Sequence, residues 1–170
     1  MNKSLCRTRI AAIFLAVLGC APNAFAAEPL TRLELAAGQP ATGVQHPAWT
    51  ADELQRIIKA DDLKVSPFRE DGVTYGTPTW IWCVEVDGNL YVRAYSGTSS
   101  SWYKAAVREK AGRIIAAGMT REVTFAPEQG PINQRIDEAY SEKYSSSPYL
   151  QGIIAEQARN ATVVITPRAQ

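Results

Sequence analysis

The first sustained apolar pattern begins near residue 50 and has the spacing of an amphipathic helix. Thr50 followed by Glu53 is the sequence signature of a capping box, in which the two side chains bind free N–H groups of the first helical turn. Apolar residues then recur at spacings of three and four, as on one face of a helix. The pattern predicts a helix over residues 51–59, and its buried stripe is expected to be Leu54, Ile57 and Ile58.

Alternating apolar and polar positions next predict a β-hairpin over residues 79–86 and 89–95. The strands turn at Asp87-Gly88, a dipeptide favoured in two-residue hairpin loops. Directly opposed residues share a face of such a hairpin. The register therefore predicts the cross-strand pairs Val86 with Asn89, Val84 with Tyr91, Trp82 with Arg93 and Trp80 with Tyr95.

A second hairpin is predicted over residues 113–117 and 120–126, joined across Gly118-Met119. Two further segments are short and rich in residues that favour strands. They are "LKVSPF" at residues 63–68 and "ATVVITP" at residues 161–167. The sequence thus supplies two hairpins and two single strands.

Three more helices are predicted between and after the hairpins. Serine caps and a Lys-Ala-Ala run favour a helix over about residues 102–110, and prolines start helices at Pro131 and Pro148. Segregated hairpins favour an antiparallel sheet, because parallel strands need a crossover connection after each strand. The predicted fold class is α+β, with a small antiparallel split-β-barrel-like sheet and flanking helices.

The first hairpin has two chemically different faces. One face is aliphatic and is expected to form the barrel interior: Ile81, Cys83, Leu90, Val92 and Ala94. The other face combines aromatic rings with one cation: Trp80, Trp82, Tyr91, Arg93 and Tyr95. Helices can cover this aromatic face, or a second subunit can bury it in a homodimer. Alternatively, it binds a small ligand.

The ligand interpretation combines ring stacking with recognition of charge. An arginine over a tryptophan contributes a cation–π contact of about 0.5–2 kcal/mol, and a flat ligand bearing an anion meets both groups. The following serine-rich loop and helix start offer hydroxyl, N–H and ammonium donors to an anion. The candidate residues for a small planar or anionic ligand are Trp80, Trp82, Arg93, Tyr95, Ser99, Ser100, Ser101 and Lys104.

The N-terminal residues 1–26 have the organisation of a secretory signal. Basic residues precede an apolar run over residues 10–18, and a small-residue pattern predicts cleavage before Ala27. The run is shorter than the ~20 residues that span a membrane, so no transmembrane segment is expected in the mature protein. We expect an exported protein, periplasmic or secreted. The alternative is a lipoprotein signal ending at "VLGC", with lipidation of Cys20.

Removal of this segment takes away three basic residues and no acidic ones, which changes the formal net charge from +1 to −2. A nearly neutral domain gives no electrostatic argument for a nucleic-acid partner. Two of the three cysteines are removed with the signal, which leaves Cys83. An intramolecular disulfide is therefore excluded in the mature protein.

Residues 27–48 are rich in proline and glycine and are predicted to be a linker, followed by a single α+β domain over residues 49–170. The one histidine, His46, lies in the linker, so a histidine-based metal site or catalytic triad has little support. Three acidic residues fall on the polar side of the helix that starts at Pro131 and are expected to face solvent: Asp137, Glu138 and Glu142.

Four blocks resemble a known bacterial family: "REDGVTYGTPTWIWCVEVDGNLYVRAYSGTSSSWYKA", "AGRIIAAGMTREVTF", "IDEAYSEKY" and "ATVVITPR". The family is domain of unknown function 2255, and the similarity covers about residues 49–168. It implies no established activity. The leading hypothesis is therefore a small-ligand-binding domain without demonstrated catalysis.

The same layout is more remotely similar to split β-barrel proteins that bind flavin mononucleotide (FMN) or deazaflavin. That similarity implies FMN or deazaflavin as the cofactor and an oxidoreductase as an alternative function. In the deazaflavin branch, basic residues lie between the glycines of the loop before the hairpin. Here Gly72 and Gly76 occupy that place, and the residues between them are not basic: Val73, Thr74 and Tyr75.

Overall fold

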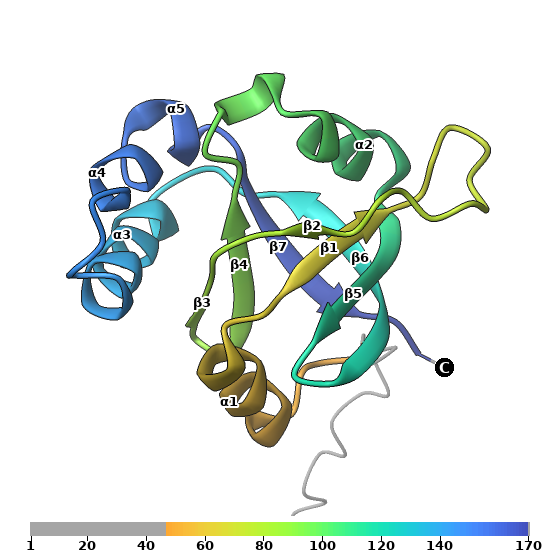
Figure 1. Ribbon diagram of the computed structural model, residues 1–170, viewed down its shortest axis with the longest axis horizontal. Coiled ribbons are helices and arrows are strands. Elements are labelled where there is room, and N and C mark those ends of the chain that lie inside the picture. The colour runs from red at the N-terminus through yellow and green to blue at the C-terminus, as the bar shows by residue number, and fades with distance from the viewer. Residues whose placement is uncertain (1–46, 170) are drawn as a thin grey trace, which may run out of the picture. The chain divides into compact units, whose positions relative to one another are not determined.

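A seven-stranded antiparallel sheet forms the centre of the computed structural model, which describes residues 47–169 (Figure 1). The strand order is β2-β1-β5-β6-β7-β4-β3, and the two edge strands are separated in sequence only by Ile81 and Trp82. The sheet therefore curls until its edges approach each other, which confirms the predicted α+β class and barrel-like sheet. The strands are β1 Lys64–Pro67, β2 Thr79–Trp80, β3 Cys83–Val86, β4 Asn89–Arg93, β5 Ala111–Ala116, β6 Met119–Pro127 and β7 Thr162–Pro167.

The helices flank this curled sheet. In Figure 1, α1 and α2 lie at opposite ends of the sheet, whereas α3, α4 and α5 lie together beside β3 and β4. Helix α3 packs on β3, and η1 and α5 are in contact. The helices are α1 Ala51–Ala60, the 3-10 helix η1 Gly97–Ser99, α2 Ser101–Glu109, α3 Ile132–Lys143, α4 Leu150–Ile153 and α5 Glu156–Arg159.

The capping box predicted for α1 is confirmed. The Glu53 N–H donates to Thr50 Oγ1 over 3.2 Å, and the Thr50 N–H donates to Glu53 Oε2 over 3.1 Å. Leu54 and Ile57 are buried, as the apolar spacing predicts. Helix α1 is one residue longer than expected and ends where Asp61 adopts a left-handed conformation, with φ of 50°.

Two apolar clusters lie on opposite sides of the sheet. The interior cluster contains the five aliphatic hairpin residues from Ile81 to Ala94, as predicted, together with side chains of α1 and α2. The second cluster joins the outer face of β3 and β4 to α3 and α4. It contains Val84, Val86, Tyr91, Ile136, Tyr140, Tyr144, Ile153 and Ala158. The outer face of the hairpin is therefore covered by helices of the same chain.

The predicted register of the first hairpin is confirmed at the turn and is wrong at its far end. Val84 pairs with Tyr91, and Val86 pairs with Asn89. Trp80, however, pairs with Lys64 of β1 instead of Tyr95. The cause is the closure of the sheet. At Ile81 the chain crosses from one edge strand to the other, and the Ile81 N–H donates to the carbonyl of Leu63 over 2.9 Å.

The second hairpin turns one residue earlier than predicted. Ala116 pairs with Met119, so the turn residues are Ala117 and Gly118, with φ of 50° and 73°. Two consecutive positive φ values are those of a type I′ turn, which matches the twist of the flanking strands. The helix predicted from Pro148 is divided into the short helices α4 and α5.

Several predictions lie outside the described residues. These are the signal over residues 1–26, the lipidation of Cys20, the position of His46 and nearly all of the linker over residues 27–48. Between residues 47 and 169, no helix has the length and apolar character needed to cross a membrane.

Candidate ligand-binding site

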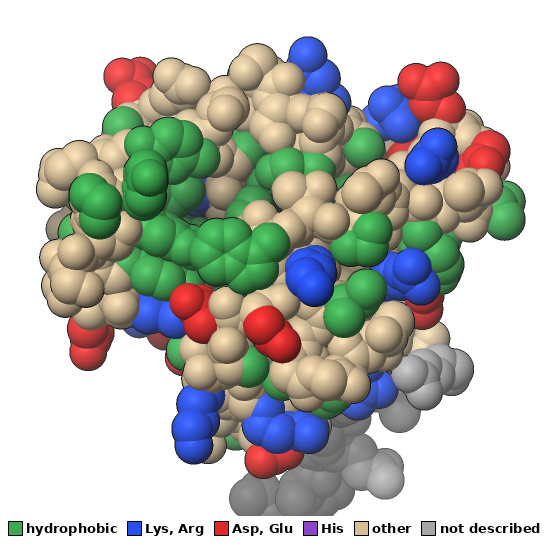
Figure 2. All heavy atoms as spheres, in the orientation of Figure 1, with side chains coloured by type: hydrophobic (Ala, Val, Ile, Leu, Met, Phe, Trp, Pro, Cys, Tyr) green, Lys and Arg blue, Asp and Glu red, His purple; other side chains and the backbone are tan. Residues whose placement is uncertain are grey.

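An apolar pocket of about 450 Å³ opens where the β2–β3 crossing, the end of β4, the start of α2 and α4 come together. We call it the aromatic pocket. Figure 2 shows hydrophobic side chains gathered on this part of the surface, between the positions of α4 and β2 in Figure 1. Its lining residues are Trp80, Ile81, Trp82, Arg93, Tyr95, Ser96, Ser100, Trp102, Tyr149 and Ile153. A volume of this size is within the range of small-molecule sites.

The structure brings five of the eight candidate residues into this lining: Trp80, Trp82, Arg93, Tyr95 and Ser100. The other three lie outside it, and each of them is exposed: Ser99, Ser101 and Lys104. Trp102 and Tyr149 also line the pocket, although the sequence pattern did not indicate them as site residues. Nothing in the local sequence of Tyr149 indicates that α4 is next to β4.

The rim of the aromatic pocket carries unusually exposed aromatic side chains. Trp80 and Tyr95 are each 53% exposed, and Tyr149 is 62% exposed. Among the described residues, only Val73 is a further large hydrophobic side chain with comparable exposure, at 76%. Exposed apolar residues that are scattered singly need no explanation, but a contiguous patch marks a binding surface.

The exposed rings are held in place. Trp80 Nε1 donates to the Asp61 carbonyl over 3.2 Å. The Tyr95 and Tyr149 rings meet edge to face, with their centroids 6.3 Å apart. Tyr95 also packs closely against Gly152, where an added Cβ atom would come within 2.4 Å of the ring. The rim is therefore a preformed surface, and the absence of a side chain at Gly152 is a condition for it.

Trp82 forms the inner wall and connects the pocket to α3. Its ring stacks on Tyr144 with a centroid distance of 4.1 Å and an angle of 5° between the ring planes. Its backbone carbonyl accepts a hydrogen bond of 3.1 Å from the Tyr140 hydroxyl. Burial raises the pKa of Tyr140 far above the ordinary phenol range, so this hydroxyl stays protonated and donates.

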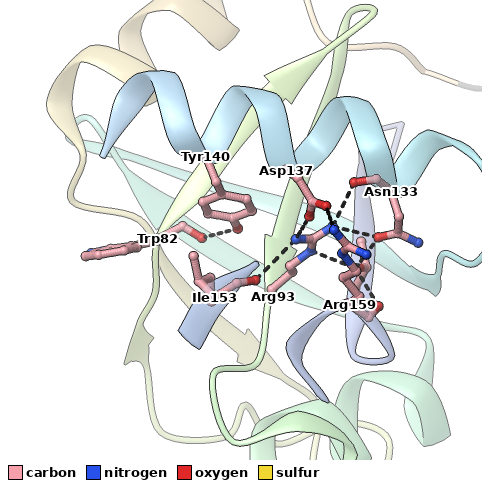
Figure 3. A network of polar contacts seen from close by, with 8 residues as sticks. Trp82, Arg93, Asn133, Asp137, Tyr140, Ile153 and Arg159 are labelled. Atoms are coloured by element: carbon pink, nitrogen blue, oxygen red, sulfur yellow. Dashed lines mark hydrogen bonds and ion pairs between the residues drawn. The ribbon is translucent and has the colours of Figure 1, made fainter. Parts of the chain in front are cut away.

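Arg93 is fully buried, and protein groups occupy all of its donors (Figure 3). Nε donates to Thr162 Oγ1 over 3.0 Å. Nη1 donates to Asp137 Oδ1 over 2.5 Å and to the Ile153 carbonyl over 3.2 Å. Nη2 donates to the backbone and side-chain oxygens of Asn133, over 3.2 and 2.7 Å. A guanidinium group has five N–H donors, so none remains for a ligand phosphate.

The surroundings of Arg93 differ from the expectation in two further ways. Its guanidinium carbon lies 5.4 Å from the ring centroid of Tyr140, so its aromatic partner is a tyrosine of α3 instead of the expected tryptophan. Asp137, expected to face solvent, is buried between Arg93 and Arg159. A carboxylate on this helix turns inward because a buried cation opposite compensates it. Glu138 and Glu142 are exposed, as expected.

A polar cluster ties the C-terminal end of α3 to the start of β3. Lys143 Nζ donates to Asp61 Oδ1 and to the Cys83 carbonyl, each over 2.8 Å. The Tyr144 hydroxyl donates to the same Asp61 oxygen over 2.5 Å. Burial raises the pKa of the Cys83 thiol to about 11, so the thiol is protonated at neutral pH. Cys83 thus behaves as a buried apolar residue, as expected, and is not an activated nucleophile.

The serine-rich loop contributes one unusual group to the pocket. Ser100 is the N-cap residue of α2, yet its side chain makes no capping hydrogen bond. Ser99 instead turns its hydroxyl to the carbonyl of Ser96 over 2.8 Å. Ser96 and Ser100 both line the aromatic pocket, so they add aliphatic hydroxyl groups to a lining that also contains the phenol groups of Tyr95 and Tyr149.

A second pocket of about 400 Å³ lies on the other side of Trp102, between the β1–β2 connection and α2. It is more polar and includes Arg69 and Arg108. Arg108 is already paired with Glu109 over 2.6 Å and lies 3.7 Å from Glu70. Over residues 47–169, no group of three or more histidine, cysteine, aspartate or glutamate side chains is placed to hold a metal ion.

A family model described as an uncharacterized protein conserved in bacteria, DUF2255, matches residues 53–165. The chain belongs to the DUF2255 family. The match includes every residue that lines the aromatic pocket, from Trp80 to Ile153. No curated protein matches the chain. Because the description of DUF2255 names no activity, a functional argument has to start from the pocket itself.

Proposed function

We propose that this DUF2255 domain binds a small planar ligand in the aromatic pocket. The observation that carries the proposal is the set of exposed aromatic rings on its rim, Trp80, Tyr95 and Tyr149, around a cavity of about 450 Å³. Exposing these rings to water is unfavourable, and a flat ligand removes them from it. Aromatic pairs contribute about 0.5–1.5 kcal/mol beyond the burial of area, so a few stacked rings suffice for specific binding.

The preformed rim supports the same proposal. Tyr95 is fixed against Gly152 and Tyr149, and Trp80 is hydrogen-bonded to the Asp61 carbonyl. Rings that are ordered before binding lose little conformational entropy when a ligand arrives. A surface that served only to cover the core has no need of half-exposed, fixed rings, because α3 already covers the outer face of β3 and β4.

The test is a titration of the mature domain with lumichrome, riboflavin and FMN, three flat probes that differ in their substituents, followed by calorimetry. We expect saturable binding of the ring system. Trp80→Ala is expected to weaken binding about tenfold, since it removes a stacking partner. The matched control is Val73→Ala, which changes an even more exposed apolar side chain away from the pocket. Failure of all three probes to bind would contradict the proposal.

The second candidate is an oxidoreductase that uses FMN or deazaflavin. It is favoured by Trp80, Trp82 and Tyr95, three of the candidate residues for a planar ligand, which all line the aromatic pocket. It requires a chromophore on the protein as isolated from its own cell. An absorption spectrum with flavin or deazaflavin bands, lost in Trp80→Ala, would support this candidate over simple binding. A colourless protein that still binds lumichrome would support the binding domain.

The third candidate is an interaction protein that dimerises through aromatic residues. Helix α3 covers the sheet face first expected to dimerise, so a partner would contact the rim residues Trp80, Tyr95 and Tyr149. This candidate predicts a dimer in sedimentation that dissociates in Tyr149→Asp. A monomer that binds a probe would exclude it.

We further propose that the domain is exported and that its N-terminal segment is cleaved before Ala27. The support is the order of basic, apolar and small residues in the first 26 positions. The intact mass of the protein from the native host separates the cases. A chain that starts at Ala27 fits ordinary cleavage, one that starts at a lipidated Cys20 fits a lipoprotein, and an unprocessed cytoplasmic chain would contradict export.

A further inference from the structure

We propose that the ligand of the aromatic pocket is an uncharged heteroaromatic compound, stacked on the aromatic rings and hydrogen-bonded at its polar edge by Ser96 and Ser100. This inference rests on the proposed function and specifies the chemical class of the ligand. It departs from the sequence-based expectation that Arg93 and Lys104 hold a phosphate.

Among the residues that the structure describes, the lining of the aromatic pocket has no cation available to a ligand. Arg93 is the one charged side chain among the described residues of the lining, and its five N–H donors are taken up by protein acceptors within 3.2 Å. Its charge is compensated by Asp137, which also pairs with Arg159 (Figure 3). An anion entering this apolar pocket would lose its hydration without gaining a charged donor, which is strongly unfavourable.

The aromatic pocket does offer uncharged polar groups to a ligand. Ser100 occupies the N-cap position of α2 without a side-chain capping bond, although serine is among the residues that normally make one. Ser100 belongs to the pocket lining, as does Ser96. A hydroxyl both donates and accepts, so it can pair with a ring carbonyl, a ring nitrogen or a ring N–H. The pocket therefore fits a flat ring system with such an edge better than a pure hydrocarbon.

The nearest alternative site for an anion is the second pocket, beyond Trp102. Arg69 and Arg108 belong to it, but Glu70 lines it too, and Arg108 is paired with Glu109 and Glu70. In the lining, two arginines face one glutamate, and Arg108 is also paired with Glu109, so most of the positive charge is already compensated. A ligand with an anionic tail gains little by extending into it.

The test compares three probes that share a ring system but differ in charge. Lumichrome and riboflavin are uncharged, whereas FMN carries a phosphate. We expect Kd values for riboflavin and FMN that agree within about threefold and change little with salt, because no charged contact forms. Binding of FMN about tenfold tighter than riboflavin, with a steep salt dependence lost in Arg108→Ala, would overturn the inference, because it would show an anion subsite.

A pair of serine variants tests the hydrogen-bonding edge. Ser100→Ala is expected to weaken lumichrome binding about five- to tenfold, since a buried polar edge of the ligand loses its partner. It should leave the melting temperature unchanged, because the side chain makes no capping bond in the folded protein. Ser101→Ala, one residue further and outside the pocket, is the matched control. Equal lumichrome affinity in both variants would contradict the role of Ser100.

The outcomes separate this inference from the proposed function. If none of the three probes binds, the proposal of a planar-ligand pocket fails. If FMN binds and riboflavin does not, the pocket binds planar ligands but the inference of an uncharged ligand is wrong. If lumichrome and riboflavin bind as well as FMN and Ser100→Ala weakens them, both stand.

Discussion

Two neighbouring regions at the end of β4 differ in the burial and the hydrogen bonding of their side chains. Around Arg93, polar groups are buried and each donor of the guanidinium has a partner on β7, α3 or α4. Two residues further along the chain, the aromatic side chain of Tyr95 is half exposed. Buried satisfied polar groups fix a structure, whereas exposed ordered apolar groups offer a surface to something else. The contrast assigns stability to the first region and binding to the second.

The largest expected effect is on the stabilising region. Arg93→Met removes the cation from a buried pair and leaves Asp137 with Arg159, whose side chain is 48% exposed. Breaking a buried ion pair by removing one partner costs about 3–5 kcal/mol. We expect a decrease of this size in the free energy of unfolding, measured by urea denaturation.

The matched control for this prediction is Arg159→Gln, which leaves Asp137 its bond to Arg93 and should cost about 1 kcal/mol or less. If Arg93→Met were no more destabilising than Arg159→Gln, the Arg93 network would not be the structural element proposed here. An unchanged Arg93→Met protein that had lost ligand binding would instead place Arg93 in the binding site.

The second effect follows from burial of the Cys83 thiol. Its pKa is raised from 9.0 to about 11 in the folded protein. The unfolded chain therefore releases the thiol proton at lower pH than the folded chain does. The stability associated with this group is present in full below pH 9 and is lost as the pH rises from 9 to about 11. The loss amounts to about 2–3 kcal/mol, because one pKa unit corresponds to 1.36 kcal/mol.

Urea denaturation at several pH values measures this loss. The stability of Cys83→Ala is measured over the same pH range as the control. This variant lacks the thiol but keeps the other titrating groups, including Tyr140 and Tyr144, whose pKa values are also raised by burial. The wild-type protein should lose about 2–3 kcal/mol more than Cys83→Ala over this interval. Parallel curves for the two proteins would mean that the thiol is accessible to water.

The parts of the fold that the sequence predicts correctly are those that depend on residues close together in the chain. The capping box at Thr50 and the hairpin turn at Asp87-Gly88 are set by residues within a few positions of each other, and both are confirmed. The position of Trp80 depends on β1, from which it is separated by a loop, and the predicted partner was wrong. Residues within a few positions of each other determine where a helix begins and where a hairpin turns. The pairing of the edge strands depends instead on how the whole sheet closes.

The candidate site shows the same limit. The hairpin pattern grouped Trp80, Trp82 and Tyr95 as candidate site residues, and all three line the aromatic pocket. The pattern did not predict that Asp137, 44 positions further along the chain, binds the guanidinium of Arg93, which is therefore not available to a ligand. Periodicity places Asp137 on the polar side of α3, but polarity alone does not distinguish solvent from a buried cation.

The third effect, on the boundary between the two regions, concerns Gly152. Gly152→Ala would put a Cβ atom 2.3–2.4 Å from the ring of Tyr95, so the ring must swing away. We expect a loss of about 1–2 kcal/mol of stability, at the lower end of the cost of overpacking because the ring is half exposed. Binding of lumichrome should weaken in the same variant. Calorimetric unfolding and titration measure the two quantities.

A double variant makes the prediction for Gly152 specific. In a Tyr95→Ala background there is no ring to displace, so Gly152→Ala should no longer lower stability. Gln151→Ala, an exposed neighbour on α4, controls for effects on the helix. A cost of Gly152→Ala that persists without Tyr95 would attribute the effect to the backbone of α4 and not to the pocket rim.

The smallest effect on stability is expected at Tyr149, and there the contrast between the two regions is sharpest. Its side chain is 62% exposed and touches mainly the edge of Tyr95, so Tyr149→Ala should change the free energy of unfolding by no more than about 0.5 kcal/mol. The same variant should weaken lumichrome binding about tenfold, because a stacking ring is lost. Tyr149→Phe keeps the ring and should keep the affinity. A Tyr149→Ala protein that binds normally would show that the exposed rim does not contact the ligand, whereas one that is destabilised like Arg93→Met would show that Tyr149 belongs to the structural region.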